Sequence, residues 1–230
     1  MNWNAFMGIA STFALLLPPT VIIGFKLYPN RSLQALFIYY FTTAIYNLTV
    51  QDFIPVSNDV RKVFGTLNNY LDVPLMLMFL MFFCAEKWKS KAIRHTLLIF
   101  IAYEFFIGWM YGFTTEANTY ILGPGIIIVL LFSTLLFGRH IKITIAQGKG
   151  LGKTLMLTSV IFSYGCFGII YLFHYIQKLE AVNDIFLLYF ISSFFTSLLM
   201  SVGIVLINKH LKTLKELKHT RKELQIFFNS

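Results

Sequence analysis

The sequence has few charged residues and few cysteines. Asp, Glu, Lys and Arg together make up 13% of its 230 residues, whereas a soluble domain carries about 25%. Hydrophobic residues make up 57% and the mean hydropathy is +0.69, so the composition fits neither a water-soluble globule nor a disordered chain. The two cysteines, Cys84 and Cys166, are too few for a disulfide scaffold.

The sequence also lacks the patterns that would define a reaction. The histidines contain no H-x-x-H or H-x-x-x-H pair, and both cysteines stand alone, so no metal site is predicted. Residues 148–154 (GKGLGKT) end like a phosphate-binding loop, but Gln147 stands where that pattern needs glycine and no strand precedes it. We therefore expect no metal and no covalent cofactor, and we favour a protein that is not an enzyme.

Long apolar runs are what the sequence does contain. A helix needs about 20 predominantly apolar residues to cross the hydrocarbon core of a membrane. Seven such runs lie at residues 5–25, 32–51, 63–85, 95–113, 117–138, 154–177 and 185–208. Because the connections between them are short, successive helices should be antiparallel neighbours. The sequence predicts an all-α membrane protein, with a seven-transmembrane-helix bundle over residues 1–208 and a tail helix over 209–230.

The basic residues predict how this bundle is oriented. With the N-terminus outside, 16 of the 19 Lys and Arg residues fall on the cytoplasmic side, and three (Arg61, Lys62 and Lys178) fall outside. Cytoplasmic loops carry such an excess of Lys and Arg. The net charge of +9 therefore records membrane orientation and not nucleic-acid binding. The start of the chain lacks the basic region of a cleavable signal, and we expect a multi-pass protein of the bacterial inner (plasma) membrane.

Polar side chains within the apolar runs are the candidate site residues, because ionisable groups at membrane depth are costly and often functional. Asp72, Glu104 and His174 are the ionisable ones. Tyr164, Phe167 and Tyr171 are three and four residues apart and share one helix face. The predicted ligand pocket comprises Asn68, Asp72, Glu104, Tyr164, Phe167, Tyr171, His174, Ser192 and Thr196.

Each of these residues also has a structural interpretation. Asp72 and Glu104 could be hydrogen-bonded to each other or to Ser and Thr side chains, joining their two helices. His174 could lie at the membrane interface, and the aromatic stripe could be core packing. Two further functional alternatives stay open. One is a proton- or cation-coupled transporter that uses Asp72 and Glu104, and the other is a lipid-modifying enzyme that uses both carboxylates and His174.

Three segments resemble the microbial (type 1) rhodopsin family. Residues 70–78 (YLDVPLMLM) are similar to the family's W-L-x-T-x-P-L-x-x run, with Pro74 in the proline position. Residues 104–112 (EFFIGWMYG) resemble the segment that surrounds the retinal ring. Residues 162–171 (FSYGCFGIIY) are similar to the W-x-x-Y-P-x-x-W/Y stretch, with Gly168 in place of its proline. The resemblance implies a rhodopsin-like seven-helix fold with a central ligand pocket.

The sequence departs from this family where retinal is attached. The family binds retinal through a lysine in the seventh helix, whereas residues 185–208 contain no lysine and Thr196 stands in that place. Ser192 and Asn68 occupy the two counterion positions, and Gly65 the arginine position. The resemblance thus implies a divergent member without covalent retinal, and it leaves a noncovalent retinoid or another isoprenoid as the candidate ligand.

The tail carries a regular apolar spacing on a basic background. Leu211, Leu214, Leu217, Leu224 and Phe228 recur at approximately helical intervals. The basic residues that we expect to bind the membrane surface or a partner are Lys209, Lys212, Lys215, Lys218, Arg221 and Lys222. Binding to anionic lipids of the inner leaflet is the interpretation that we favour. The alternatives are a cytoplasmic partner, or a second copy in a homo-oligomer, that docks on this helix.

The sequence thus predicts a noncatalytic receptor, sensor or accessory protein. It would bind a small apolar or amphipathic ligand in a central pocket.

Overall fold

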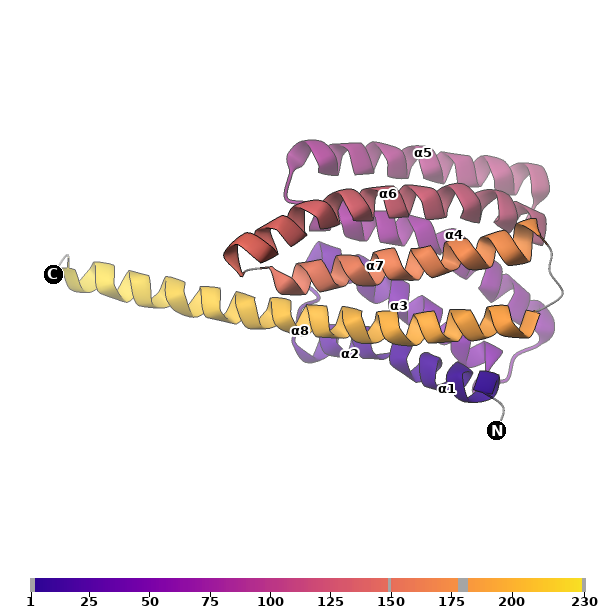
Figure 1. The fold of residues 1–230 in the computed structure, drawn as a ribbon, viewed down its shortest axis with the longest axis horizontal. Coiled ribbons are helices and arrows are strands. Elements are labelled where there is room, and N and C mark those ends of the chain that lie inside the picture. The colour runs from indigo at the N-terminus through magenta and orange to yellow at the C-terminus, as the bar shows by residue number, and fades with distance from the viewer. Residues whose placement is uncertain (1–2, 149, 178–181, 229–230) are drawn as a thin grey trace.

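The computed structural model describes residues 3–148, 150–177 and 182–228, and this part of the chain is helical with no strand. The helices are α1 (Trp3–Leu15), α2 (Leu17–Gly24), α3 (Arg31–Val50), α4 (Asn58–Phe83), α5 (Lys87–Tyr111), α6 (Thr115–Gln147), α7 (Leu151–Ile170), the π-helical turn η1 (Tyr171–Ile176) and α8 (Val182–Phe228). They lie side by side as one bundle, which α8 leaves at one end (Figure 1).

Six helical segments of the described chain are long and apolar enough to cross a membrane. They are α1 with α2, then α4, α5, α6, α7 with η1, and α8. Large apolar side chains such as Phe105, Trp109 and Ile127 are exposed on the outside of the bundle, which soluble proteins rarely show over a large area. The chain is therefore suited to crossing a lipid bilayer several times.

The helix α3 is the predicted span that does not belong to these six. Its 20 residues include Thr43, Asn47 and Thr49, which lower its hydropathy, yet all three are buried. The bundle places α3 against α1, α2 and α4. Ile38 and Phe41 of α3 are exposed on the outside of the bundle, whereas its polar residues face the interior, where the neighbouring helices cover them. Composition alone does not show this.

The helices close into a ring in chain order. Contacts join α3 to α4, α4 to α5, α5 to α6, α6 to α7 and α7 to α8, and α8 returns to α1 and α2. The helix α4 also contacts α6, which draws α4 towards the interior of the ring. Successive helices are antiparallel neighbours, as their short connections predict.

Proline and glycine shape two places in the bundle. The first span is divided at Leu16, because Pro18 and Pro19 in the first turn of α2 have no backbone N–H to donate to α1. Gly152 and Gly203 allow α7 and α8 to touch. A Cβ atom built on Gly152 would lie 2.7 Å from the Gly203 carbonyl oxygen.

Several helices extend beyond the predicted apolar runs. The helix α5 begins at Lys87 and α6 ends at Gln147. Glu86 pairs with Lys89 of α5 (3.1 Å) and with Arg139, which lies eight residues before the end of α6. The helix α8 does not stop at residue 208 but continues to Phe228. At 47 residues it is about 70 Å long, so the tail is a direct continuation of the last helix (Figure 1).

Candidate ligand-binding pocket

One end of the bundle contains a pocket of about 310 Å³ between α3, α4, α6, α7 with η1, and α8. Its volume lies at the lower end of the range of about 300–1,000 Å³ that is usual for ligand sites. Along α3 it reaches from Tyr39 to Val50, or about 16 Å. The lining residues are Tyr39, Thr43, Tyr46, Asn47, Val50, Asn68, Asn69, Asp72, Leu122, Ile126, Phe167, Ile170, Tyr171, His174, Tyr175, Phe186, Tyr189 and Phe190.

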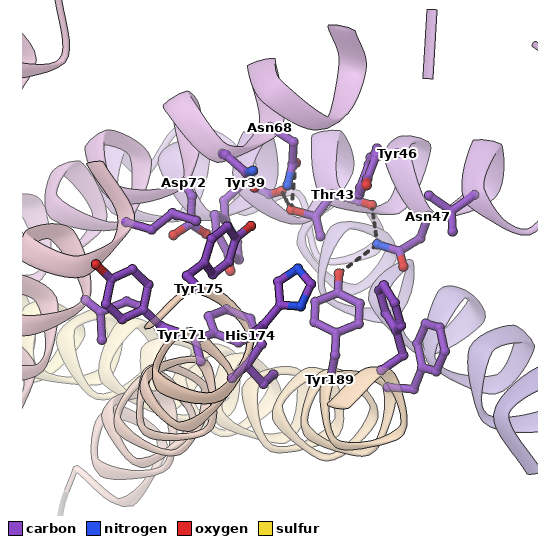
Figure 2. Close-up of a pocket in the computed structure, with 18 residues that line it drawn as sticks. Tyr39, Thr43, Tyr46, Asn47, Asn68, Asp72, Tyr171, His174, Tyr175 and Tyr189 are labelled. Carbon is purple, nitrogen blue, oxygen red and sulfur yellow. Dashed lines mark hydrogen bonds between the residues drawn. The ribbon is translucent and has the colours of Figure 1, made fainter. Parts of the chain in front are cut away.

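Asp72 lies at the inner end of the pocket. Its Oδ2 accepts a hydrogen bond of 2.9 Å from the hydroxyl of Tyr164, a fully buried residue of α7. Tyr39 of α3 lies beside the same carboxylate (Figure 2). Three helices that are distant in the sequence therefore meet at one acidic side chain.

A chain of hydrogen bonds follows the α3 side of the pocket (Figure 2). The Asn47 amide donates to the Thr43 carbonyl (2.9 Å) and to the Tyr189 hydroxyl (3.0 Å). The Thr43 hydroxyl donates to the Tyr39 carbonyl (2.9 Å) and lies 3.3 Å from Asn68 Oδ1. These contacts fix α3 against α4 and α8, and they hold polar groups at the cavity surface.

Aromatic rings form the opposite side. Tyr189 is stacked on Phe167, with the ring centroids 5.9 Å apart and the planes inclined by 20°. Tyr171 is stacked on Tyr175 at 5.8 Å, and the Tyr171 hydroxyl donates to the Thr119 carbonyl (3.0 Å). The pocket therefore combines flat apolar surfaces with a polar side.

The π-helical turn η1 positions the outer part of this aromatic side. In η1 the Gln177 N–H donates to the Leu172 carbonyl, five residues earlier. Such turns are rare and frequently occur at functional sites. The wider turn presents Tyr171, His174 and Tyr175 to the same cavity, and the His174 ring meets the edge of Tyr175 at 4.9 Å.

The structure brings together six of the nine predicted pocket residues. Asn68, Asp72, Phe167, Tyr171 and His174 line the cavity, and Tyr164 adjoins it through its hydrogen bond to Asp72. The other three, Glu104, Ser192 and Thr196, are buried and do not line it.

Thr196 lies in the contact between α7 and α8. The Thr196 hydroxyl donates to the Ser193 carbonyl (3.2 Å), and the Thr196 carbonyl accepts from Ser159 of α7 (2.8 Å). Ser192 Oγ and Glu104 Oε1 are buried without a hydrogen-bond partner. Thr196 is seven residues from Tyr189 and so lies on the same face of α8, but it is two turns beyond Tyr189, past the part of α8 that lines the cavity. The described lining of the cavity includes no residue of α5, the helix of Glu104.

Within the described residues, no hydrogen bond joins Asp72, Glu104 and His174. The buried partner of Asp72 is Tyr164, so the hydrogen bond connects α4 to α7, in place of the expected connection to the helix of Glu104. The described residues contain no group of three or more His, Cys, Asp or Glu side chains that could hold a metal ion. The transport and enzyme alternatives stay predictions.

Sequence reasoning missed most of the contribution of α3. Tyr39, Thr43, Tyr46 and Val50 line the pocket together with Asn47, whose polar side chain within an apolar run is the one that the sequence marks at this depth. They recur at intervals of three and four residues, which places them on one helix face. This polar and aromatic stripe in an otherwise apolar run was the signal available in the sequence. Tyr175 and Tyr189 were also missed, and their neighbours gave no comparable pattern.

The predicted binding residues of the tail divide into two groups. Lys209 and Lys212 are exposed on α8, and Lys212 Nζ lies 6.0 Å from the centre of the Phe25 ring. The side chains of Lys215, Lys218, Arg221 and Lys222 lie outside the part of the structure that is described. Their binding to lipid or to a partner stays a prediction.

The chain matches no known family model, no curated protein and no solved structure. The function of the chain must therefore be inferred from its own residues, and the resemblance to microbial rhodopsins stays a prediction.

Proposed function

We propose that this protein binds a small amphipathic ligand in the pocket between α3, α4, α6, η1 and α8, and that it acts as a membrane receptor, sensor or accessory protein. The observation that carries the proposal is the cavity itself. It is about 310 Å³ in size and combines stacked aromatic rings with the polar groups of Asn47, Asn68 and Asp72. Apolar pockets with a few convergent polar groups are the usual form of small-ligand sites.

The basic residues support a particular orientation within this proposal. Lys26, Arg31, Lys87, Arg139 and Lys209 lie at the end of the bundle away from the pocket, and that end is cytoplasmic by the positive-inside rule. In a seven-span arrangement that includes α3, the pocket then lies in the outer half of the membrane. A ligand would enter from outside, and α8 would connect the pocket to the cytoplasmic tail.

The proposed ligand is bound noncovalently. The described residues that line the cavity include no lysine that could form a Schiff base with a carbonyl ligand. A retinoid or another isoprenoid is the candidate that the rhodopsin resemblance supplies, and the aromatic side of the pocket suits a flat apolar body.

A pair of adjacent substitutions tests the pocket. Ile126 lines the cavity and is buried, whereas Ile127 is exposed on the outside of the same helix. Ile126→Phe should fill part of the cavity, and Ile127→Phe adds the same volume on the lipid side. The purified protein is analysed by native mass spectrometry for copurified compounds, and its thermal unfolding is measured with and without retinol or farnesol.

A ligand at 100 times its Kd should stabilise the native protein by about 2.7 kcal/mol. We expect this stabilisation in the natural protein and in Ile127→Phe, and its loss in Ile126→Phe. The proposal is refuted if no compound copurifies and no added ligand changes the stability. It is also refuted if both phenylalanine variants bind equally well.

A further inference from the structure

The charge of the described lining of the pocket is one-sided. Asp72 is the one carboxylate among its described lining residues, and neither lysine nor arginine lines it. The two side chains beside its carboxylate, Tyr164, which donates a hydrogen bond, and Tyr39, are both neutral. Asp72 is half-buried, and an acidic side chain that is partly removed from water is costly to keep charged unless a positive charge or further hydrogen bonds compensate it. The pocket therefore has an unmatched acidic group at its inner end.

The aromatic rings add a second attraction for positive charge. Phe167 and Tyr189 are stacked, and Phe190 meets the edge of Tyr189 at 5.6 Å. The faces of such rings attract cations by about 0.5–2 kcal/mol each when they lie within about 6 Å. A carboxylate at one end of an aromatic cavity is suited to a group that is both cationic and partly apolar.

We infer that the ligand of this pocket is an organic cation whose ammonium group binds Asp72, beside Tyr39 and Tyr164, and whose apolar body lies along Phe167, Tyr171 and Tyr189. This inference rests on the proposed function, because it assigns the chemical class of the ligand in the same cavity. A carboxylate or phosphate ligand would be repelled by Asp72. A neutral ligand could donate a hydrogen bond to Asp72 through a hydroxyl or amide group, but it would leave the negative charge without a counter-charge.

The test compares two probes of nearly equal shape. Phenethylamine carries an ammonium group, whereas 2-phenylethanol has a neutral hydroxyl in the same position. Binding of both to the full-length purified protein is measured by isothermal titration calorimetry. We expect the amine to bind at least tenfold more tightly than the alcohol.

Three variants decide whether Asp72 is responsible. Asp72→Asn should reduce the affinity for the amine to that for the alcohol, and should change the affinity for the alcohol less than twofold. Asp72→Glu keeps the charge and should retain the preference. Glu104→Gln removes a buried carboxylate that does not line the cavity, and it should leave both affinities unchanged. Gel filtration and helical circular dichroism confirm that each variant is folded.

The outcomes separate this inference from the function on which it rests. Equal binding of amine and alcohol to the natural protein overturns the inference but leaves the pocket as a ligand site, provided that Ile126→Phe abolishes both. The inference is also overturned if Asp72→Asn still prefers the amine. It is overturned as well if Asp72→Glu, which keeps the charge, is folded and loses the preference just as Asp72→Asn does. If neither probe binds and nothing copurifies, the inference and the proposed function both fail.

Discussion

The contact between α7 and α8 provides a sharp test of the packing. A Cβ atom on Gly203 would lie 2.6 Å from Met156 Cγ and 2.9 Å from the Gly152 carbonyl oxygen, whereas ordinary contacts of a Cβ atom are 3.4–4 Å. The Met156 side chain can turn away, but the carbonyl belongs to the backbone of α7. The two helices would therefore have to separate by several tenths of an ångström.

Gly165 is the matched control for Gly203→Ala. It also lies inside a helix, and a Cβ atom there would meet nothing within 4 Å. Replacing glycine by alanine in a helix interior stabilises it by about 0.5–1 kcal/mol, and this gain should be common to both positions. Overpacking costs about 1–3 kcal/mol and applies to Gly203 alone. We thus expect Gly203→Ala to be less stable than Gly165→Ala by about 2 kcal/mol.

The measurement is thermal unfolding of the two variants in the same detergent. At about 2–4 °C per kcal/mol for a protein of this size, the two Tm values should differ by about 4–8 °C. The Tm of the natural protein should lie between the Tm values of the two variants or close to that of Gly203→Ala. If Gly203→Ala is as stable as Gly165→Ala, the close approach of α7 and α8 does not exist as described.

Three further predictions concern single interactions. Tyr164→Phe removes the hydrogen bond to Asp72 and should destabilise the protein by about 0.6–1.7 kcal/mol, the range for such bonds in membranes; a double-mutant cycle with Asp72→Ala that shows additive effects would contradict it. Thr114→Ala removes the cap that accepts from a backbone N–H at the start of α6 and should cost about 1 kcal/mol, which chemical denaturation measures. The hydrogen bond from Lys89 lowers the pKa of Glu86. The ionised Glu86 therefore stabilises the folded protein at neutral pH, and this stabilisation should be lost as the pH falls below 4.5 and through the lowered pKa. The Tm of Glu86→Gln should fall less over this range, and an equal fall would refute the role of Glu86.

The sequence predicted most of the spans because a backbone in lipid must satisfy its hydrogen bonds within each segment. It predicted the helix ends less well. The helix α5 begins eight residues before the expected position 95, and α8 continues past residue 208, since a helix need not end where the membrane does. The division at Leu16 follows from Pro18 and Pro19, and both are plain in the sequence.

The candidate site was predictable only in part. Asp72 and Thr196 both lie within apolar runs, yet Asp72 lines the cavity, whereas Thr196 lies two turns beyond Tyr189 on the same face of α8 and packs against α7. How far a cavity extends along a helix depends on the side chains of all the neighbouring helices. The role of α3 was hidden for the same reason, because its polar residues only lower its hydropathy until the surrounding helices cover them.

By itself, the sequence determined that this chain forms apolar helices, with most of the basic residues in the segments that connect them on one side. These properties are local, because they follow from the length, hydropathy and charge of each segment. The tertiary structure alone decided that Tyr164, which is 92 residues from Asp72, is its hydrogen-bond partner, and that five helical segments enclose one aromatic cavity. Such contacts arise only when the helices pack, because each depends on the position and rotation of several segments at once.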